Sequence, residues 1–262
     1  MKKYLYIYKA TLIENLQYIM NILLGFISFF IILFVFLNLW EYIYSDTLSI
    51  SGYSMNQMVW YVIITEIMWF GTRNRTLTNQ ISNDIKSGTI AYGINKPYNY
   101  LFYIVSKHLG EITIKFFLFL TAGILLGFSF VGKLYNFHIR FLPLIILAAF
   151  TGILINSVIR IGISILSFWI EDSGPFHWIY DKLIIVVGTL FPIEVFPVWI
   201  QPFIKGSPIY VVTYGPAKLI IDFTMDMFFK VFAVQLVYLV VTIFLLGILF
   251  KRGVKKLNVN GG

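Results

Sequence analysis

The sequence predicts an all-α integral membrane protein, with six transmembrane helices in one domain that covers residues 1–262. Of the 262 residues, 59% are hydrophobic and only 12% are charged, whereas soluble domains carry about 25% charged residues. Long windows are almost purely apolar, and in "ILLGFISFFIILFVFL" (Ile22–Leu37) only Ser28 has a side chain that can hydrogen-bond. About 20 apolar residues span a bilayer as a helix, which satisfies its own backbone hydrogen bonds. Runs of this length therefore indicate spanning helices.

Residues 1–17 precede the first span and show helical periodicity. One apolar stripe repeats at intervals of three and four, through Leu5, Tyr8, Leu12, Leu16 and Ile19. Polar side chains such as Thr11 and Glu14 fall off this stripe. The pattern predicts an amphipathic helix that lies on the membrane surface. A solvated start of the first span is the alternative that the pattern leaves open.

Hydropathy then divides the rest of the chain into six spans separated by polar connections. We expect them at Tyr18–Trp40, at Met55–Gly71, from inside the helix after Pro97 to Val131, at Phe141–Trp169, at Leu183–Phe196 and at Met227–Phe250. The helix after Pro97 is expected to run some way before it enters lipid, because Lys107, Glu111 and Lys115 recur along it, and Lys107 therefore counts with the second connection.

Lysine and arginine residues set the orientation, because cytoplasmic loops carry an excess of them. With an even number of spans, the N-terminus, the second connection and the C-terminus share one side. Twelve basic residues fall there: Lys2, Lys3, Lys9, Arg73, Arg75, Lys86, Lys96, Lys107, Lys251, Arg252, Lys255 and Lys256. The third connection carries only Lys133 and Arg140. Both termini are therefore predicted to be cytoplasmic.

The second connection, residues 72–98, contains the polar stretch "NQISNDIKSGTIAYGINKP". Leu77, Ile81 and Ile85 are spaced by four and predict a short amphipathic helix of about two turns. Thr78 is the expected N-cap and Gly88 the expected terminator. Pro97 is expected to open the next helix. This helix either docks a soluble partner through its polar edge or seals the bundle at the interface.

Residues 192–222 are apolar enough to pass for a span, yet five of the eight prolines of the chain lie between Pro192 and Pro216. Each proline inside a helix costs about 3 kcal/mol. Broken helices at membrane depth need surrounding protein or water. The segment is predicted to be a re-entrant or surface helical pair on the outer side, with a simple amphipathic loop as the alternative.

Glu66, Asn156 and Arg160 are the polar residues that we single out well inside the expected spans, whereas Asn21 and Asn38 lie near the ends of the first span. Ionisable residues in a membrane are costly and are candidates for function. A pair between Glu66 and Arg160 would cancel both charges. Alternatively, Arg160 extends to the inner interface.

The polar connection and the proline-rich segment together resemble the type-2 permeases of ATP-binding-cassette (ABC) exporters, in the subfamily long described as permeases of unknown function. The residues that carry the resemblance are Asp84–Ile90 with Lys96-Pro97, Phe168-Trp169 with Glu171, Pro192 with Phe196, Pro197 and Trp199, and Ser207-Pro208 with Tyr214, Gly215 and Pro216. One departure is Leu190-Phe191 ahead of Pro192, where such permeases often have glycine or serine. Because of this departure, the resemblance does not determine the conformation of the turn before Pro192.

The resemblance implies six spans, a connecting helix over residues 1–17, a coupling helix over 79–87 and two re-entrant helices between the last two spans. It implies a bacterial cytoplasmic membrane, a second permease subunit, identical or homologous, and two separate ATPase subunits that bind ATP and Mg. The residues expected to contact an ATPase subunit are Asn83, Asp84, Lys86, Ser87, Gly88 and Thr89. An outer gate is expected from Phe196, Trp199, Tyr210 and Tyr214, with an interfacial aromatic belt as the alternative.

The sequence lacks the groups that most other functions need. It has no cysteine and no phosphate-binding glycine loop, so we expect neither a disulfide nor ATP bound to this chain. Its three histidines are far apart, which argues against a metal site. The net charge of +8 is spread beside the spans, which argues against nucleic acid. The leading hypothesis is a non-enzymatic permease subunit of an ABC exporter. The alternative is a proton-coupled secondary transporter with Glu66 as the proton carrier.

Overall fold

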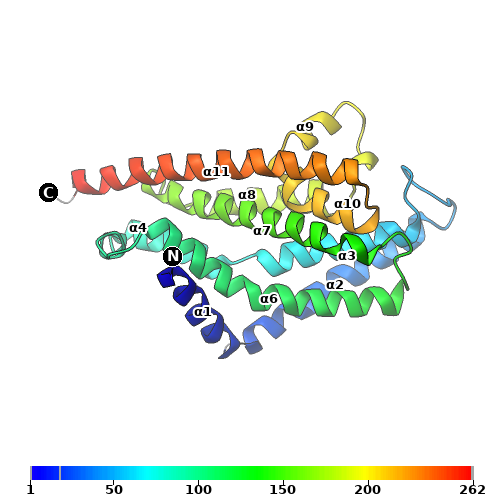
Figure 1. The fold of residues 1–262 in the computed structure, drawn as a ribbon, viewed down its shortest axis with the longest axis horizontal. Helices are drawn as coiled ribbons and strands as arrows, with labels where there is room; N and C mark the ends of the chain where they lie inside the picture. The colour runs from blue at the N-terminus through cyan, green and yellow to red at the C-terminus, as the bar shows by residue number, and fades with distance from the viewer. Residues whose placement is uncertain (1, 18, 261–262) are drawn as a thin grey trace.

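The computed structural model describes residues 2–17 and 19–260, and the expectations for Met1, Tyr18 and the last two glycines lie outside it, as does the side chain of Ile19. Within these two ranges the chain forms helices and turns with no β-strand. The helices form an elongated bundle (Figure 1). One end, here called the α4 end, holds both termini and helix α4 (Arg75–Lys86). The other, here called the α9 end, holds the connection after α2 and helix α9 (Gln201–Lys205).

The long helices of the bundle are α2 (Ile19–Ile43), α6 (Tyr100–Phe130), α7 (Leu142–Ile165) and α11 (Met225–Asn260). Within the described residues, four segments are long and apolar enough to cross a membrane, and each coincides largely with one of these helices: Leu24–Ile43, Tyr100–Phe130, Ile139–Phe168 and Met225–Leu257. The expectation of an all-helical membrane chain is therefore confirmed. The other two expected spans correspond to α3 (Met55–Thr72) and to α8 (Gly174–Leu183) with its π-helical continuation η3 (Ile184–Thr189).

Helix α3 lies at the centre of the bundle. All of its residues from Met58 to Thr72 are buried. Gly123 and Gly127 of α6 let the two helices approach, because a Cβ at either position would overlap Ile67 or Trp60 of α3. Since other helices of the same chain surround α3, it can carry polar side chains that a lipid-facing helix could not.

Helix α1 (Lys2–Gln17) has the expected extent and packs on the first half of α6. The two backbones meet at Gly110, where a Cβ would lie 2.7 Å from the carbonyl oxygen of Tyr8. The face that packs carries Thr11, which is buried, whereas Leu5 and Leu16 of the expected apolar stripe are exposed. The expected stripe is therefore divided: Leu5 and Leu16 are left exposed, whereas Tyr8 and Leu12 are half-buried beside Thr11, and the Tyr8 hydroxyl lies 3.2 Å from that of Thr113 on α6.

Three helix boundaries differ from those expected. Helix α6 begins after Asn99, whose side chain accepts a hydrogen bond from the Phe102 backbone N–H, so Pro97 precedes the helix and does not open it. Helix α8 begins at Gly174, nine residues before the expected span, because Pro175 suits the first turn of a helix. Helix α11 continues beyond Phe250, because no proline or capping residue interrupts its basic end.

Residues 190–222 break into short pieces, as the prolines predicted. The pieces are η4 (Ile193–Val195), α9, the π-helix η5 (Tyr210–Tyr214) and α10 (Gly215–Ile221). Helix α9 projects from the bundle in Figure 1, whereas η5 is buried throughout. The segment therefore has an exposed limb, α9, and an inserted limb, η5 and α10, whereas η4 before them is partly buried, with Ile193 in the core. Gln235 of α11 holds the inserted limb, donating to the carbonyl of Val211 at 2.9 Å.

Candidate functional site

Helix α4 is an amphipathic helix whose apolar face is covered by its own chain. Leu77, Ile81 and Ile85 are buried in one cluster with Ile161 and Ile165 of α7. The predicted stripe is therefore correct, but the helix is longer than expected, since it has 12 residues.

The two ends of α4 follow from single residues. The N-cap is Asn74 and not Thr78: the Asn74 side chain accepts from the Leu77 N–H at 3.1 Å. Thr78 lies inside the helix, where its hydroxyl donates to the Asn74 carbonyl at 3.1 Å. Gly88 follows the helix with a φ of +74°, as expected for a terminator.

The polar edge of α4 and the turn after it hold the six residues expected to contact an ATPase subunit. Asn83, Lys86, Ser87 and Thr89 are exposed, and Asp84 and Gly88 are partly exposed. The turn is ordered by its own side chains, because the hydroxyls of Ser87 and Thr89 lie 2.9 Å apart and Thr89 also reaches Asp84. The surface is thus polar, preformed and free of large apolar side chains.

Helix α4 is also linked to the start of α8. The hydroxyls of Ser82 and Ser173 are 2.6 Å apart and both residues are buried. Lys86 lies 3.9 Å from Asp172, at a more exposed position. A displacement of α4 would therefore move the N-terminal end of α8.

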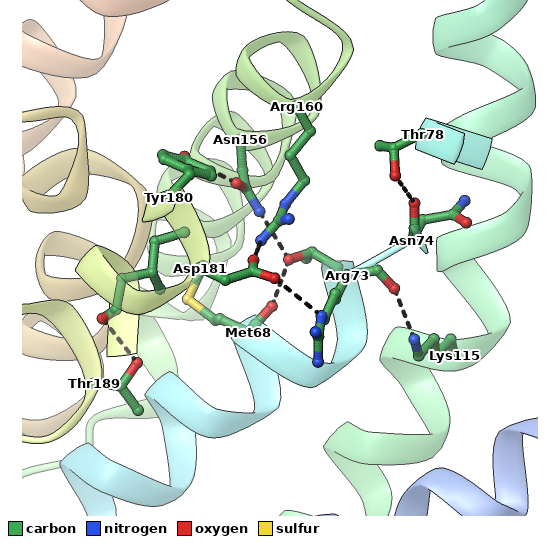
Figure 2. A network of polar contacts seen from close by, with 12 residues as sticks. Met68, Arg73, Asn74, Thr78, Lys115, Asn156, Arg160, Tyr180, Asp181 and Thr189 are labelled. Atoms are coloured by element: carbon green, nitrogen blue, oxygen red, sulfur yellow. Dashed lines mark hydrogen bonds and ion pairs between the residues drawn. The ribbon is translucent and has the colours of Figure 1, made fainter. Parts of the chain in front are cut away.

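A buried ionic cluster lies directly beneath α4, at the junction of three helices (Figure 2). Asp181 of α8 accepts from Arg160 of α7 at 2.8 Å and lies 3.2 Å from Nε of Arg73, the residue that follows α3. Arg160 and Asp181 are both buried. Each guanidinium also lies over an aromatic ring: Arg73 over Trp69 at 4.8 Å and Arg160 over Tyr180 at 5.3 Å.

Amides and hydroxyls extend this cluster into the bundle. Asn156 donates to the Thr72 hydroxyl at 2.9 Å and accepts from the Tyr180 hydroxyl at 3.0 Å. Lys115 of α6 donates to the backbone carbonyl of Arg73 at 2.7 Å (Figure 2). Four helices therefore meet in one polar network: α3, α6, α7 and α8.

This arrangement corrects two expectations for Arg160. It does not pair with Glu66, because Asp181 is its partner, and it does not extend to the interface, because only 3% of its surface is exposed. Asp181 and Arg73 were missed as site residues. Asp181 was assigned to a loop, and the signal that could have found it was the start of α8 at Gly174-Pro175.

Glu66 lies in the buried part of α3, with 1% of its surface exposed. Its Oε2 atom has no hydrogen-bond partner among the described residues. One turn further along the same face, Phe70 packs edge-to-face on Phe29 of α2 at 5.5 Å. Among the described residues, the Glu66 carboxyl group forms no ion pair with Arg73 or Arg160, whose partner is Asp181.

The four expected gate residues at the α9 end do not form one group. Tyr210 and Tyr214 are buried and stacked, with ring centroids 5.5 Å apart. The Tyr214 hydroxyl donates to Glu194 at 2.5 Å. Phe196 is half-buried beside Phe191, and Trp199 is 71% exposed.

Tyr53, in the connection before α3, lies against the same tyrosine cluster. Burial, and then the nearby Glu194 carboxylate, raise the pKa of Tyr53. Lys218 of α10 lies 4.3 Å from the centre of the Tyr53 ring and pairs with Asp222 at 3.3 Å. The α9 end thus has its own set of polar contacts, built mainly from tyrosine hydroxyls.

A family model described as "ABC-2 family transporter protein" matches residues 29–261 of the chain, which is nearly all of it. The chain belongs to the ABC-2 transporter family. The resemblance noted from the coupling stretch and the proline-rich segment is therefore confirmed. No curated protein matches the sequence in the comparison.

As an ABC-2 family protein, the chain is a membrane transport protein, consistent with a permease. The polar groups of this ABC-2 protein lie at two levels. One level joins α4 to the ionic cluster, and the other joins Glu194 to the tyrosines at the α9 end. Both levels contact the continuous helix formed by α8 and η3. Asp181 of the ionic cluster belongs to α8. At the other level, the Tyr61 hydroxyl donates to the carbonyl of Gly188, in η3, at 2.7 Å.

Proposed function

We propose that the chain is the permease subunit of an ATP-driven ABC exporter in the bacterial cytoplasmic membrane. Two such permeases would form the translocation path, and two separate ATPase subunits would bind ATP and Mg. The observation that carries the proposal is α4. Its apolar face is buried in its own chain, whereas its polar edge is exposed at the end of the bundle where both termini lie.

The six-span topology is part of this proposal. Helix α3 and the continuous helix of α8 and η3 would cross the membrane beside the four long apolar helices. Their polar residues are compatible with this, because Glu66 of α3 and Asp181 of α8 are buried in protein and do not face lipid. Both termini and α4 would then be cytoplasmic, in agreement with the twelve basic residues on that side.

The contacts of α4 suggest how a motor subunit would drive the permease. An ATPase that binds Asn83, Asp84 and the turn at Gly88 would push on a helix seated on α7. The Ser82–Ser173 contact would pass the displacement to α8, and the Arg73–Asp181–Arg160 cluster would move α3, α7 and α8 as one unit. Buried ion pairs suit this role because their geometry tolerates little distortion.

A second permease subunit needs an apolar face to pack against, and α8 with η3 offers one. Five large side chains are exposed there: Phe176, Trp178, Ile179, Leu183 and Val186. Exposed apolar patches mark contacts with protein or membrane. This helix also carries Asp181 and Gly188, which contact the two levels of polar groups. A displacement at either end of the molecule would therefore be transmitted to a subunit bound to this helix.

A pair of matched charge reversals tests the proposal. Lys86→Glu lies on the polar edge of α4, and Lys133→Glu makes the same change in an exposed connection at the α9 end. We expect Lys86→Glu to lower co-purification with the ATPase subunit encoded beside this chain, and to lower ATP-dependent transport, at least about tenfold, the loss expected for about 1.4 kcal/mol of binding. Lys133→Glu should leave both unchanged. Equal assembly and transport in the two variants would rule out α4 as the docking element.

A proton-coupled secondary transporter that uses Glu66 is the second candidate, because one oxygen of that buried carboxyl has no partner among the described residues. It predicts transport that follows the proton gradient and continues when ATP hydrolysis is abolished. Glu66→Gln would then stop transport, whereas in an ATP-driven permease it would leave ATP-dependent transport largely intact.

A further inference from the structure

An apolar groove lies between α7 and α11, in the half of the bundle nearer the α4 end. It has a volume of about 210 Å³ and is lined on α7 by Ile159, Gly162 and Ile163 and on α11 by Leu245 and Leu249. Among the groove's lining side chains, only Thr242 carries a polar atom, and its hydroxyl already donates to the backbone carbonyl of Tyr238 at 2.7 Å. The groove therefore offers an occupant no polar contact along its length.

The groove exists because Gly162 has no side chain. A Cβ placed there would meet only Leu246, at 3.9 Å. Elsewhere the two helices are in close contact: Gln235 of α11 donates to the Ala148 carbonyl at 2.8 Å, and a Cβ at Gly253 would overlap Phe168. The space is thus bounded at both ends and open along one side.

Beyond the groove, the same face of α11 carries two basic residues. Thr242, Leu245 and Leu249 lie on one face of the helix, and continuing at intervals of three and seven places Arg252 and Lys256 on that same face. Both are exposed. On the α7 side, Trp169 follows the groove residue Leu166 and is 41% exposed. Lys251 and Lys255 lie on the other side of α11.

We propose that this groove binds one acyl chain of an anionic phospholipid, with the phosphate held by Arg252 and Lys256. Arginine binds phosphate through paired hydrogen bonds, and lysine adds a point charge. Tryptophan is favoured at the level of the headgroups. An acyl chain needs no polar partner, so it matches a lining without free hydrogen-bonding groups. The inference depends on the membrane location of the chain and not on its partnership with an ATPase.

A second copy of this chain is the other occupant of the right size. It fits less well, because it would have to bring its own surface against Arg252 and Lys256, and the basic ends of two like chains repel each other. A phospholipid supplies both the apolar chain and the negative charge. The lipid would come from the leaflet at the α4 end, where the two cations lie.

The test uses the full chain purified in mild detergent with an equimolar mixture of phosphatidylglycerol and phosphatidylcholine, and native mass spectrometry to count bound lipids. The double variant Arg252→Gln/Lys256→Gln removes the two groove-side charges. Lys251→Gln/Lys255→Gln removes the same net charge from the other side of the same helix. We expect the first variant to lose about thirtyfold in the affinity for phosphatidylglycerol, from about a factor of five for each charge. The second should lose less than about twofold, because charges on the far side of a helix contribute little to a site.

Gly162→Leu provides an independent test, because a Cβ at this position meets only Leu246, at 3.9 Å, so the leucine side chain can extend into the groove while every charge stays in place. We expect it to displace the bound phospholipid while the thermal unfolding temperature stays near that of the wild type. Three results would overturn the proposal. Equal losses in the two charge variants would indicate general surface attraction, and retention of the lipid in Gly162→Leu would place it elsewhere. Efficient disulfide dimers from Leu245→Cys in membranes would assign the groove to a second copy.

Discussion

The two ends of the molecule are held together by different forces. At the α4 end, two arginines share one buried aspartate, and the apolar face of the capped helix α4 is buried against the bundle. At the α9 end, the chain is broken by prolines, two helices adopt the π form, and the polar contacts come from tyrosine hydroxyls. The first arrangement ties α3, α7 and α8 together through charge-assisted contacts to one carboxylate. The second depends on a few neutral or singly charged hydrogen bonds, each contributing about 1 to 3 kcal/mol.

This difference matches the tasks of the two ends in the proposed exporter. An ATPase subunit transmits force efficiently only to a rigid element, so the end of the permease that contacts the ATPase should not deform. A gate must open, so the end that releases cargo should have contacts that can be exchanged one at a time. The π-helices η3 and η5 fit this view, because such segments are strained and frequent at functional sites. They also touch each other, since a Cβ at Gly188 would overlap Thr213.

The largest effect is expected from Asp181→Asn, which breaks the α4 end. It leaves the buried charge of Arg160 and the partly buried charge of Arg73 without a counter-charge, and removing one partner of a buried pair costs about 3 to 5 kcal/mol. We expect a strongly lowered unfolding temperature in detergent, measured by tryptophan fluorescence, and loss of transport.

The matched control is Asp226→Asn, which removes the aspartate of an exposed pair with Lys230 at 2.6 Å. Exposed pairs contribute about 0 to 1 kcal/mol, so this variant should be nearly as stable as the wild type. If the two aspartate variants unfold at the same temperature, the ionic cluster does not hold the α4 end together.

The sequence predicted the buried face of α4 better than it predicted the ionic cluster. Leu77, Ile81 and Ile85 are neighbours on one helix, so their spacing alone indicated the buried face. Arg160 and Asp181 are brought together by the packing of two helices, and no local pattern reports such a pairing. The sequence suggests Glu66 as a partner of Arg160 because both residues lie inside expected spans. The error had a local origin, since assigning the start of α8 to a loop removed Asp181 from consideration.

The same reasoning explains the α9 end. Five prolines in 25 residues predicted a broken segment correctly, because proline acts on its own backbone. They could not indicate which limb would be inserted, since that depends on contacts such as the one between Gln235 and Val211. The four aromatic residues proposed as a gate were grouped by proximity in the sequence, and the fold separates Trp199 from the two buried tyrosines.

A smaller effect is expected from Tyr214→Phe, which weakens the α9 end. It removes the hydrogen bond to Glu194 and leaves that carboxylate, already partly buried, with fewer partners. We expect a loss of about 1 to 3 kcal/mol in the free energy of unfolding, because the bond is to a charged group. In reconstituted vesicles, cargo should leak without ATP.

Tyr135→Phe serves as the control, because Tyr135 is exposed in a connection at the same end. It should change neither stability nor leak. A tight, fully coupled Tyr214→Phe variant would mean that the tyrosine cluster is scaffold, and the contrast between a rigid and an adjustable end would lose its main support.

The smallest effect on stability is expected from Trp199→Ala. The indole lies outside the buried tyrosine cluster and is 71% exposed, so its removal should change the free energy of unfolding by less than about 0.5 kcal/mol. Such a side chain can close a path only against another subunit. We therefore expect the variant to assemble normally and yet hydrolyse ATP without a matching export of cargo.

Tyr42→Ala is the control, because Tyr42 is an equally exposed aromatic residue near the end of α2, on the same side of the molecule. A residue of an interfacial belt anchors the chain at the headgroups, so its loss should lower the amount of protein in the membrane and leave coupling intact. If Trp199→Ala behaves like Tyr42→Ala in both measurements, Trp199 belongs to the belt, and the gate is confined to Tyr210, Tyr214 and the residues that hold them.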